Sequence, residues 1–214
     1  MGMRFPLRRG NLTEPFTACS GRAGGVMKVP RAGSRRAFAI AVWRMARHIR
    51  TRTWAATAES GTLTSLTNID CDGNVLGQVA YERDALPEDP EGCFGTTGVT
   101  EILAVDATHF LVIERATVEN ADGVFQNVVK VYEIDVTGAT DTATITALTG
   151  EDIVPVSKRL VLDLSVAGVE PVDNIEGIAW GPALENGSRS LVLVSDNNVD
   201  ETQVQQFIAL EVVG

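Results

Sequence analysis

The chain of 214 residues is long enough to bury a sizeable hydrophobic core, and its length alone predicts one or two domains. The net charge of −10 divides unevenly: residues 1–53 hold 12 Lys/Arg and one acid (net +11), and residues 54–214 hold 6 Lys/Arg and 27 Asp/Glu (net −21). The acidic part would repel phosphates, so it is not expected to bind nucleic acid. The chain has no apolar run of about 18 residues, so no transmembrane helix is expected.

Residues 1–53 form a basic arm in which Arg and Gly are scattered without a helix or strand period, which predicts a leader of low order outside the fold. Ser34 to Trp43 (SRRAFAIAVW) has the paired arginines and apolar run of a twin-arginine export signal. That run is only seven residues long, and Arg44 ends it. We therefore favour an unstructured or misassigned leader over an export signal.

From residue 54 the pattern is that of strands, and helical periodicity is weak. Gly61 to Asn68 and Val75 to Glu82 predict a hairpin around the turn CDGN, whose Asp72-Gly73 pair is a typical hairpin signal. A loop rich in Pro, Asp, Glu and Gly follows at 86–98. The further predicted strands are VTEILAV (99–105), HFLVIER (109–115), NVVKVYEIDV (127–136), IEGIAW (175–180), SLVLVSD (190–196) and QVQQFIALEVV (203–213), while KRLVLDL (158–164) fits a short strand or a helical turn.

An internal repeat relates residues 99–136 to residues 174–213, with Glu101 aligned to Glu176 at an offset of 75 residues. Each unit has three or four strands in roughly 40 residues, the size of a β-propeller blade. The first strand of each blade lines the central channel of a propeller, so the two carboxylates are predicted to converge there. A shared calcium would relieve their repulsion, and the alternative, equally compatible with the spacing, is that each Glu lies at a strand edge in solvent.

Further candidate residues follow two strands. SDNNVDE offers the oxygens of Asp196 and Asn197 as calcium ligands, or a turn that uses Asp and Asn for their conformational tolerance. The adjacent Glu114 and Arg115 are expected to make ion pairs with neighbouring strands, and Arg115 near a cation could also bind a phosphate oxygen.

Other chemistries find little support in the sequence. The chain has no G-x-S-x-G nucleophile motif and only two histidines, which argues against a serine nucleophile and against a histidine-rich metal site. Cys71 and Cys93 could form a disulfide in an oxidising compartment or remain free thiols.

Several blocks in order resemble the C-terminal half of the phytase-like family, whose description is "esterase-like activity of phytase". They are GVTEILAVDATHFLVIERA, NVVKVYEIDVTGATD, KRLVLDL and DNIEGIAWGPALENGSRSLVLVSDNN followed by QVQQFIALEV. The resemblance runs from about Trp54 to the C-terminus. The positions that match its motifs are Glu101, Glu114, Arg115, Asn174, Glu176, Asp196 and Asn197.

The resemblance implies an all-β, partial β-propeller-like fold of antiparallel blades at 54–214, exported to the periplasm or the cell exterior, with calcium-assisted hydrolysis of a small phosphomonoester. In this hypothesis Glu101, Glu176, Asp196 and Asn197 hold calcium, while Arg115 and Glu114 are the catalytic residues that act on the phosphate. The chain lacks the N-terminal half of the family, so a truncated product is expected. The alternatives are a non-catalytic calcium-binding or interaction module and an inactive fragment.

Overall fold

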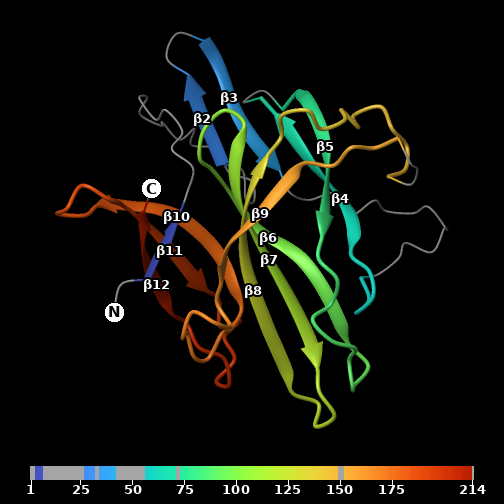
Figure 1. The fold of residues 1–214 in the computed structure, drawn as a ribbon, viewed down its shortest axis with the longest axis vertical. Helices are drawn as coiled ribbons and strands as arrows, with labels where there is room; N and C mark the ends of the chain where they lie inside the picture. The colour runs from blue at the N-terminus through green and yellow to red at the C-terminus, as the bar shows by residue number, and fades with distance from the viewer. Residues whose placement is uncertain are drawn as a thin grey trace.

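The structure is a computed structural model that describes residues 56–70, 73–148 and 152–213 in full and the backbone of three N-terminal strands (Figure 1). The described part contains strands and no helix, as the sequence predicts. The strands are β1 (Met3–Pro6), β2 (Met27–Arg31), β3 (Ser34–Ala41), β4 (Thr62–Ile69), β5 (Val75–Arg83), β6 (Gly95–Ala104), β7 (His109–Glu119), β8 (Phe125–Asp135), β9 (Ser157–Asp163), β10 (Ile175–Ala183), β11 (Arg189–Ser195) and β12 (Phe207–Val213).

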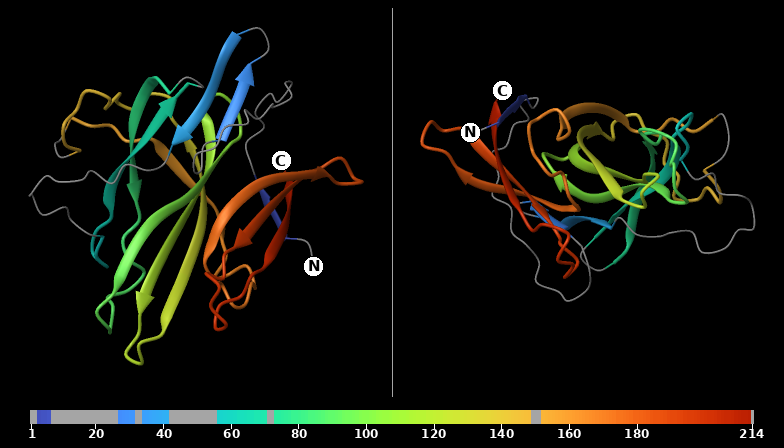
Figure 2. Two further views of the ribbon diagram at one scale, coloured as in Figure 1. Left: turned by 180° about the vertical axis from the view of Figure 1, so that it is seen from behind. Right: turned by 90° about the horizontal axis from the view of Figure 1, so that it is seen from below.

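These strands make four-stranded sheets in the orders β2-β3-β4-β5, β6-β7-β8-β9 and β1-β12-β11-β10. The sheet β6–β9 runs through the middle of the molecule, with the other two on either side of it (Figures 1 and 2). Neighbouring strands pair antiparallel, except that β1 pairs parallel with β12. Repeated four-stranded sheets that do not close into a barrel confirm the expected partial propeller-like fold.

The predicted repeat corresponds to real sheets. Strands β6, β7 and β8 of the first unit correspond to β10, β11 and β12 of the second. Residues 158–164, left open between strand and helical turn, mostly lie in β9, the fourth strand of the first unit. The chain between Asp135, the end of β8, and Ser157, the start of β9, is therefore a long connection inside one sheet.

Three strands are described within the basic N-terminal segment, for which the sequence predicts low order. Strand β1 pairs with β12, and β2 and β3 extend the sheet of β4 and β5. Strand β3 includes the paired arginines of the export-signal pattern. Strand periodicity could not reveal these pairings, because they depend on exposed edges of the β4–β5 and β10–β12 strands that need a partner. The proposed boundary between residues 53 and 54 remains a prediction.

The alternation of side chains along β7 builds a separate core on each face of the central sheet. Phe110 and Val112 pack with Leu66 and Tyr81 of the β2–β5 sheet. Leu111 and Ile113 pack on the other face with residues from β10, β11 and β12. The central sheet is thus buried on both faces, and a polar residue on β7 belongs to one inter-sheet space or the other.

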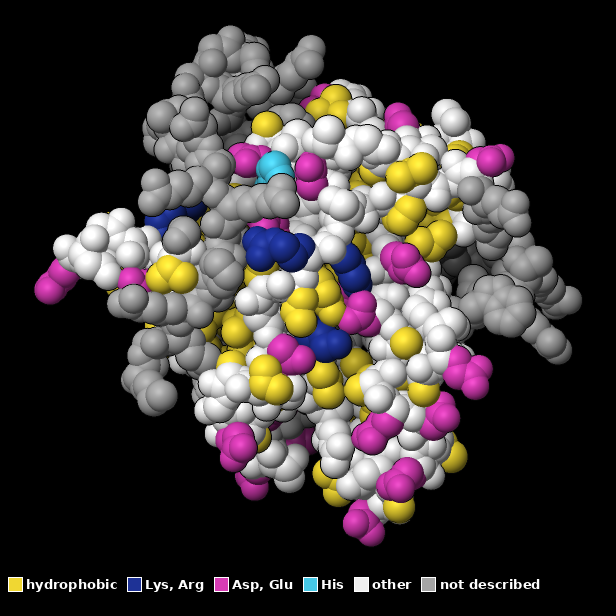
Figure 3. Space-filling view, in the orientation of Figure 1, with side chains coloured by type: hydrophobic (Ala, Val, Ile, Leu, Met, Phe, Trp, Pro, Cys, Tyr) yellow, Lys and Arg dark blue, Asp and Glu magenta, His cyan; other side chains and the backbone are white. Residues whose placement is uncertain are grey.

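Charge is unevenly spread over the surface. On the face shown in Figure 3, Lys and Arg side chains gather near the middle, and acidic side chains are frequent toward the lower end. The acidic body predicted from the sequence therefore has a locally mixed charge where the sheets meet.

Candidate functional site

The first strands of the two repeat units lie side by side. The Thr100 hydroxyl donates to the carbonyl oxygen of Ile175 at 3.1 Å, and the Trp180 indole N–H donates to the carbonyl oxygen of Ala104 at 3.0 Å. These bonds join β6 to β10, the edge strands of their sheets. Glu101 and Glu176 therefore lie on neighbouring strands, as the repeat predicts.

Arg115 connects the two sheets at this junction. Its guanidinium nitrogen lies 3.1 Å from Oε1 of Glu176. Burial lowers the pKa of Arg115, and the negative charges of Glu176 and Asp173 partly oppose that effect. Arg115 is half-buried while Glu176 is exposed, so the ion pair has a solvent-facing side from which an anion could approach.

Glu101 lies on the same face of the central sheet as Arg115. It is directly opposite Ile113 on β7, and residues opposite each other on paired strands share a face. Burial raises the pKa of Glu101, although its carboxylate accepts the N–H of Ile102 at 2.9 Å. Burial therefore makes Glu101 harder to ionise than a free glutamate.

Glu114 does not share the site with Arg115. Consecutive strand residues point to opposite faces, and Glu114 points toward the β2–β5 sheet. It accepts hydrogen bonds from the Tyr81 hydroxyl, from Nζ of Lys158 at 2.6 Å and from the backbone N–H of Asp84 at 2.9 Å. Glu114 and Arg115 both make ion pairs, but with Lys158 on β9 and Glu176 on β10 rather than with the strands next to β7, and the two pairs belong to different inter-sheet spaces.

The space around Glu114 holds a charge network that the sequence analysis missed. Nζ of Lys158 also lies 2.6 Å from Asp84, which accepts further bonds from the Tyr132 hydroxyl and from Nζ of Lys130 at 3.3 Å. Lys158 packs over the rings of Tyr132 and Tyr81, 4.1 and 5.2 Å from their centroids.

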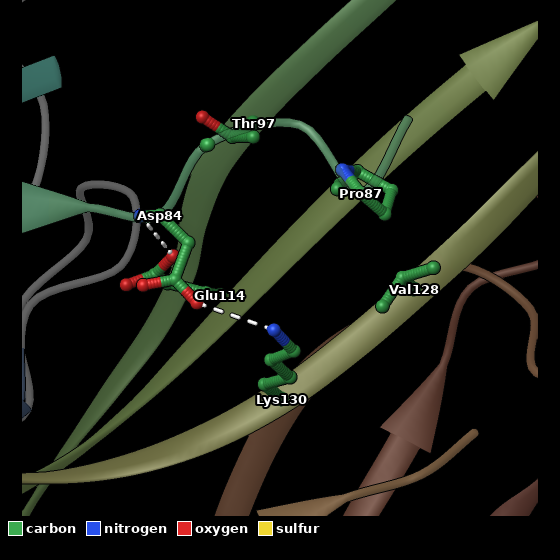
Figure 4. Close-up of a pocket in the computed structure, with 8 residues that line it drawn as sticks. Asp84, Pro87, Thr97, Glu114, Val128 and Lys130 are labelled. Atoms are coloured by element: carbon green, nitrogen blue, oxygen red, sulfur yellow. Dashed lines mark hydrogen bonds and ion pairs between the residues drawn. The ribbon is translucent and has the colours of Figure 1, made fainter. Parts of the chain in front are cut away.

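The network shifts the pKa values of several of its side chains. Burial raises the pKa of Tyr81 and of Tyr132, and their carboxylate partners raise it further. Burial alone would raise the pKa of Asp84, but the hydrogen bonds from Lys158 and Tyr132 have the larger effect and lower it. Figure 4 shows Asp84 and Glu114 beside each other with Lys130 directed toward them, at a small hollow also lined by Thr97 and Val128. No short motif signals this network, because its members come from β5, β7, β8 and β9.

The loop after β11 has the geometry of a turn. Asp196 Oδ1 accepts the N–H of Asn198 at 3.0 Å, and Asn197 Oδ1 accepts the N–H of Val199 at 3.2 Å. Asn198 and Val199 have φ of 50° and 58°, in the left-handed region. The buried Asn174 donates to the carbonyl oxygen of Asp196 at 3.1 Å. Oδ1 of Asp196 and Oδ1 of Asn197 thus help to shape the loop.

Two further sequence expectations fall outside this junction. Cys93 is an exposed free thiol, and Cys71 lies outside the described residues, so a disulfide between them is not seen. His109 sits at the start of β7, where Nδ1 lies 3.0 Å from Asp106 and Nε2 lies 3.6 Å from Asp135. His109 therefore joins the β6–β7 turn to the end of β8.

Comparison with known proteins identifies the family. The model of the phytase-like family, described as "Esterase-like activity of phytase", matches residues 48–199. The chain belongs to the phytase-like family. No curated protein and no solved structure matches it. The match spans β4 to β11 and so includes the β6–β10 junction and the network around Lys158.

The calcium ligands predicted from the sequence make other contacts in the described part of this phytase-like chain. Within residues 56–70, 73–148 and 152–213, no three His, Cys, Asp or Glu side chains gather in a way that could hold a metal ion. Glu176 is paired with Arg115, and Asp196 and Asn197 accept backbone N–H groups. Calcium prefers six to eight oxygen ligands. The predicted set of Glu101, Glu176, Asp196 and Asn197 does not fit calcium in this arrangement.

The described part of this phytase-like chain has no helix long and apolar enough to cross a membrane.

Proposed function

We propose that this phytase-like chain hydrolyses phosphate monoesters at the junction of β6 and β10, where Arg115 binds the phosphate group. The observation that carries the proposal is the Arg115–Glu176 pair at 3.1 Å, on the same face of the central sheet as Glu101, whose pKa burial raises. A planar guanidinium presents two parallel N–H groups that match two phosphate oxygens. Its partial burial strengthens that attraction.

Arg115, Glu176 and Glu101 have separate roles in the proposed hydrolysis. Arg115 exchanges Glu176 for the phosphate oxygens, and the released Glu176 carboxylate accepts a proton from the attacking water. Oxygen of that water bonds to phosphorus while the bond from phosphorus to the ester oxygen breaks. Glu101 in its protonated form, which burial favours over the free group, donates its proton to the leaving oxygen. The products are an alcohol and inorganic phosphate, and the proton taken up by Glu176 later returns to Glu101 through solvent.

The test is steady-state release of phosphate from phytate and from para-nitrophenyl phosphate. Arg115→Met is expected to lower kcat/KM by about 10- to 100-fold, the range of one lost charge-assisted hydrogen-bonding group. Arg115→Lys should recover only part of the loss, since an ammonium keeps the charge without the fork. The matched control is Arg189→Met on β11, whose guanidinium stacks 3.5 Å from the Trp180 ring. Equal rates for the two Met variants would refute the assignment.

One observation favours a second function, that of a binding module without turnover. The Arg115 guanidinium already joins two sheets through Glu176, and that structural role requires no reaction. Phosphate or phytate binding that depends on Arg115, with no phosphate released by the wild-type chain, would select this alternative.

The family resemblance implies a calcium requirement, which the contacts of the described donors do not support, and a location outside the cytoplasm, which stays a prediction. Calcium binding at Glu176 or Asp196 would require their present contacts to Arg115 and Asn198 to break. We therefore assign no step of the reaction to the cation.

A further inference from the structure

One end of the central sheet exposes an aromatic pair. Phe94, before β6, and Phe125, at the start of β8, are 45% and 56% exposed. Their ring centroids lie 5.6 Å apart in an edge-to-face arrangement. Val124 beside them is also exposed. We call these three residues the aromatic tip.

Backbone bonds hold the aromatic tip in place. The loop before β6 is fastened to the β7–β8 hairpin by hydrogen bonds from Gly92 N–H to the Glu119 carbonyl (3.0 Å) and from Glu119 N–H to the Phe94 carbonyl (2.9 Å). The Cys93 N–H adds a bond to the Glu119 carboxylate at 2.8 Å. The two rings are therefore positioned before any partner arrives, which lowers the entropy cost of binding.

The surroundings of the aromatic tip are uniformly acidic. Residues 86–98 and 116–127 contain five acids and no Lys or Arg, namely Glu88, Asp89, Glu91, Glu119 and Asp122. Figure 3 shows this concentration of acidic side chains, interspersed with apolar ones, at the lower end of the molecule. Two of the acids, Glu91 and Glu119, also accept backbone N–H groups of the facing loop. An apolar centre with an acidic rim is complementary to a cationic partner that carries apolar side chains.

We propose that the aromatic tip is a docking surface for a cationic peptide segment of another protein, which places an apolar or aromatic side chain on Phe94 and Phe125 and its Lys or Arg side chains on the acidic rim. Exposed, preorganised aromatic residues are typical anchors of protein interfaces. The same negative rim repels nucleic acid and anionic lipid surfaces, which argues for a peptide partner over either of these.

The test uses the full chain and a short fluorescein-labelled peptide of alternating Arg and Trp, followed by fluorescence anisotropy. The wild-type chain is expected to bind, with affinity falling as salt rises. The double variant Phe94→Ser/Phe125→Ser should weaken binding by about tenfold or more, the effect of losing an aromatic anchor. The control is Phe207→Ser on β12, because Phe207 is 74% exposed and lies outside the aromatic tip. A second pair of variants, Asp122→Lys and Asp152→Lys, changes the net charge of the chain equally. A difference in peptide affinity between them therefore reports the local charge at the aromatic tip.

Each outcome decides for or against the proposal. Weaker binding in the double variant and in Asp122→Lys, with both controls close to wild type, supports it. Equal binding in all variants would show general attraction to an acidic protein and would overturn it. Peptide binding unchanged in the double variant, together with self-association that the same variant abolishes, would show that a second copy of the chain covers the tip. Circular dichroism melts verify that the variants are folded.

Discussion

Replacement of Lys158 by Met tests whether the charge network holds the central sheet to the β2–β5 sheet. The substitution keeps an unbranched chain between the Tyr81 and Tyr132 rings but removes the ammonium that lies 2.6 Å from both Glu114 and Asp84. Lys158 is 19% and Glu114 5% exposed, so the glutamate charge would stay buried without its cation. Breaking a buried ion pair by removing one partner costs about 3–5 kcal/mol.

That loss is large against the total stability of a domain, which is about 5–15 kcal/mol. For a chain of this size it corresponds to a fall in melting temperature of roughly 6–20 °C. The assay is urea and thermal unfolding followed by circular dichroism. The matched control is Lys130→Met, since Lys130 is more exposed and reaches only Asp84, at 3.3 Å. Its expected cost is about 0–1 kcal/mol. Equal effects of the two substitutions, or a loss under about 1 kcal/mol for Lys158→Met, would refute the assignment of a buried ion pair.

Three further predictions concern the β6–β10 junction. Burial raises the pKa of Glu101, so this group contributes stability that is complete below its unfolded pKa and is lost as pH rises through its folded pKa. Glu101→Gln should therefore have the wild-type melting temperature in acid and a higher melting temperature than wild type at neutral pH. A lower melting temperature at neutral pH would contradict this. Trp180→Phe removes the hydrogen bond to Ala104 and should cost about 1–2 kcal/mol in urea unfolding, while no change would mean that this bond does not help to join the sheets. Excess calcium, compared with chelator, should leave the melting temperature unchanged, because the predicted ligands are already engaged, and a rise would show that they regroup around the ion.

Strand positions and the repeat were predictable because they depend on local alternation. HFLVIER and NVVKVYEIDV lie in β7 and β8, and the predicted hairpin before them is β4 and β5. The repeat also corresponds to a contact in the structure, because Thr100 hydrogen-bonds to Ile175, 75 residues further along the chain. The pairing of β3 with β4, and of β2 with β3, could not be predicted, because an Arg-rich segment shows no strand period when its partner decides its structure.

The site was predictable only in part. The neighbouring positions of Glu101 and Glu176 follow from the repeat, and the separation of Glu114 from Arg115 follows from the alternation of side chains along any strand. The contacts of Lys158 with Glu114 and Asp84 depend on how two sheets pack, which no spacing in the sequence encodes. The turn formed by Asp196 and Asn197 was one of the two alternatives for that loop.

The most direct test of the central claim follows the Nε–Hε signals of the arginines by nuclear magnetic resonance as phytate is added to the full chain. If phosphate binds at the β6–β10 junction, the Arg115 signal should shift in a saturable way, the Arg189 signal should stay in place, and Glu101→Gln should leave binding intact while slowing phosphate release. An Arg115 signal that does not move, while phytate shifts signals of Lys130 or Lys158, would contradict the account and would locate the site at the charge network.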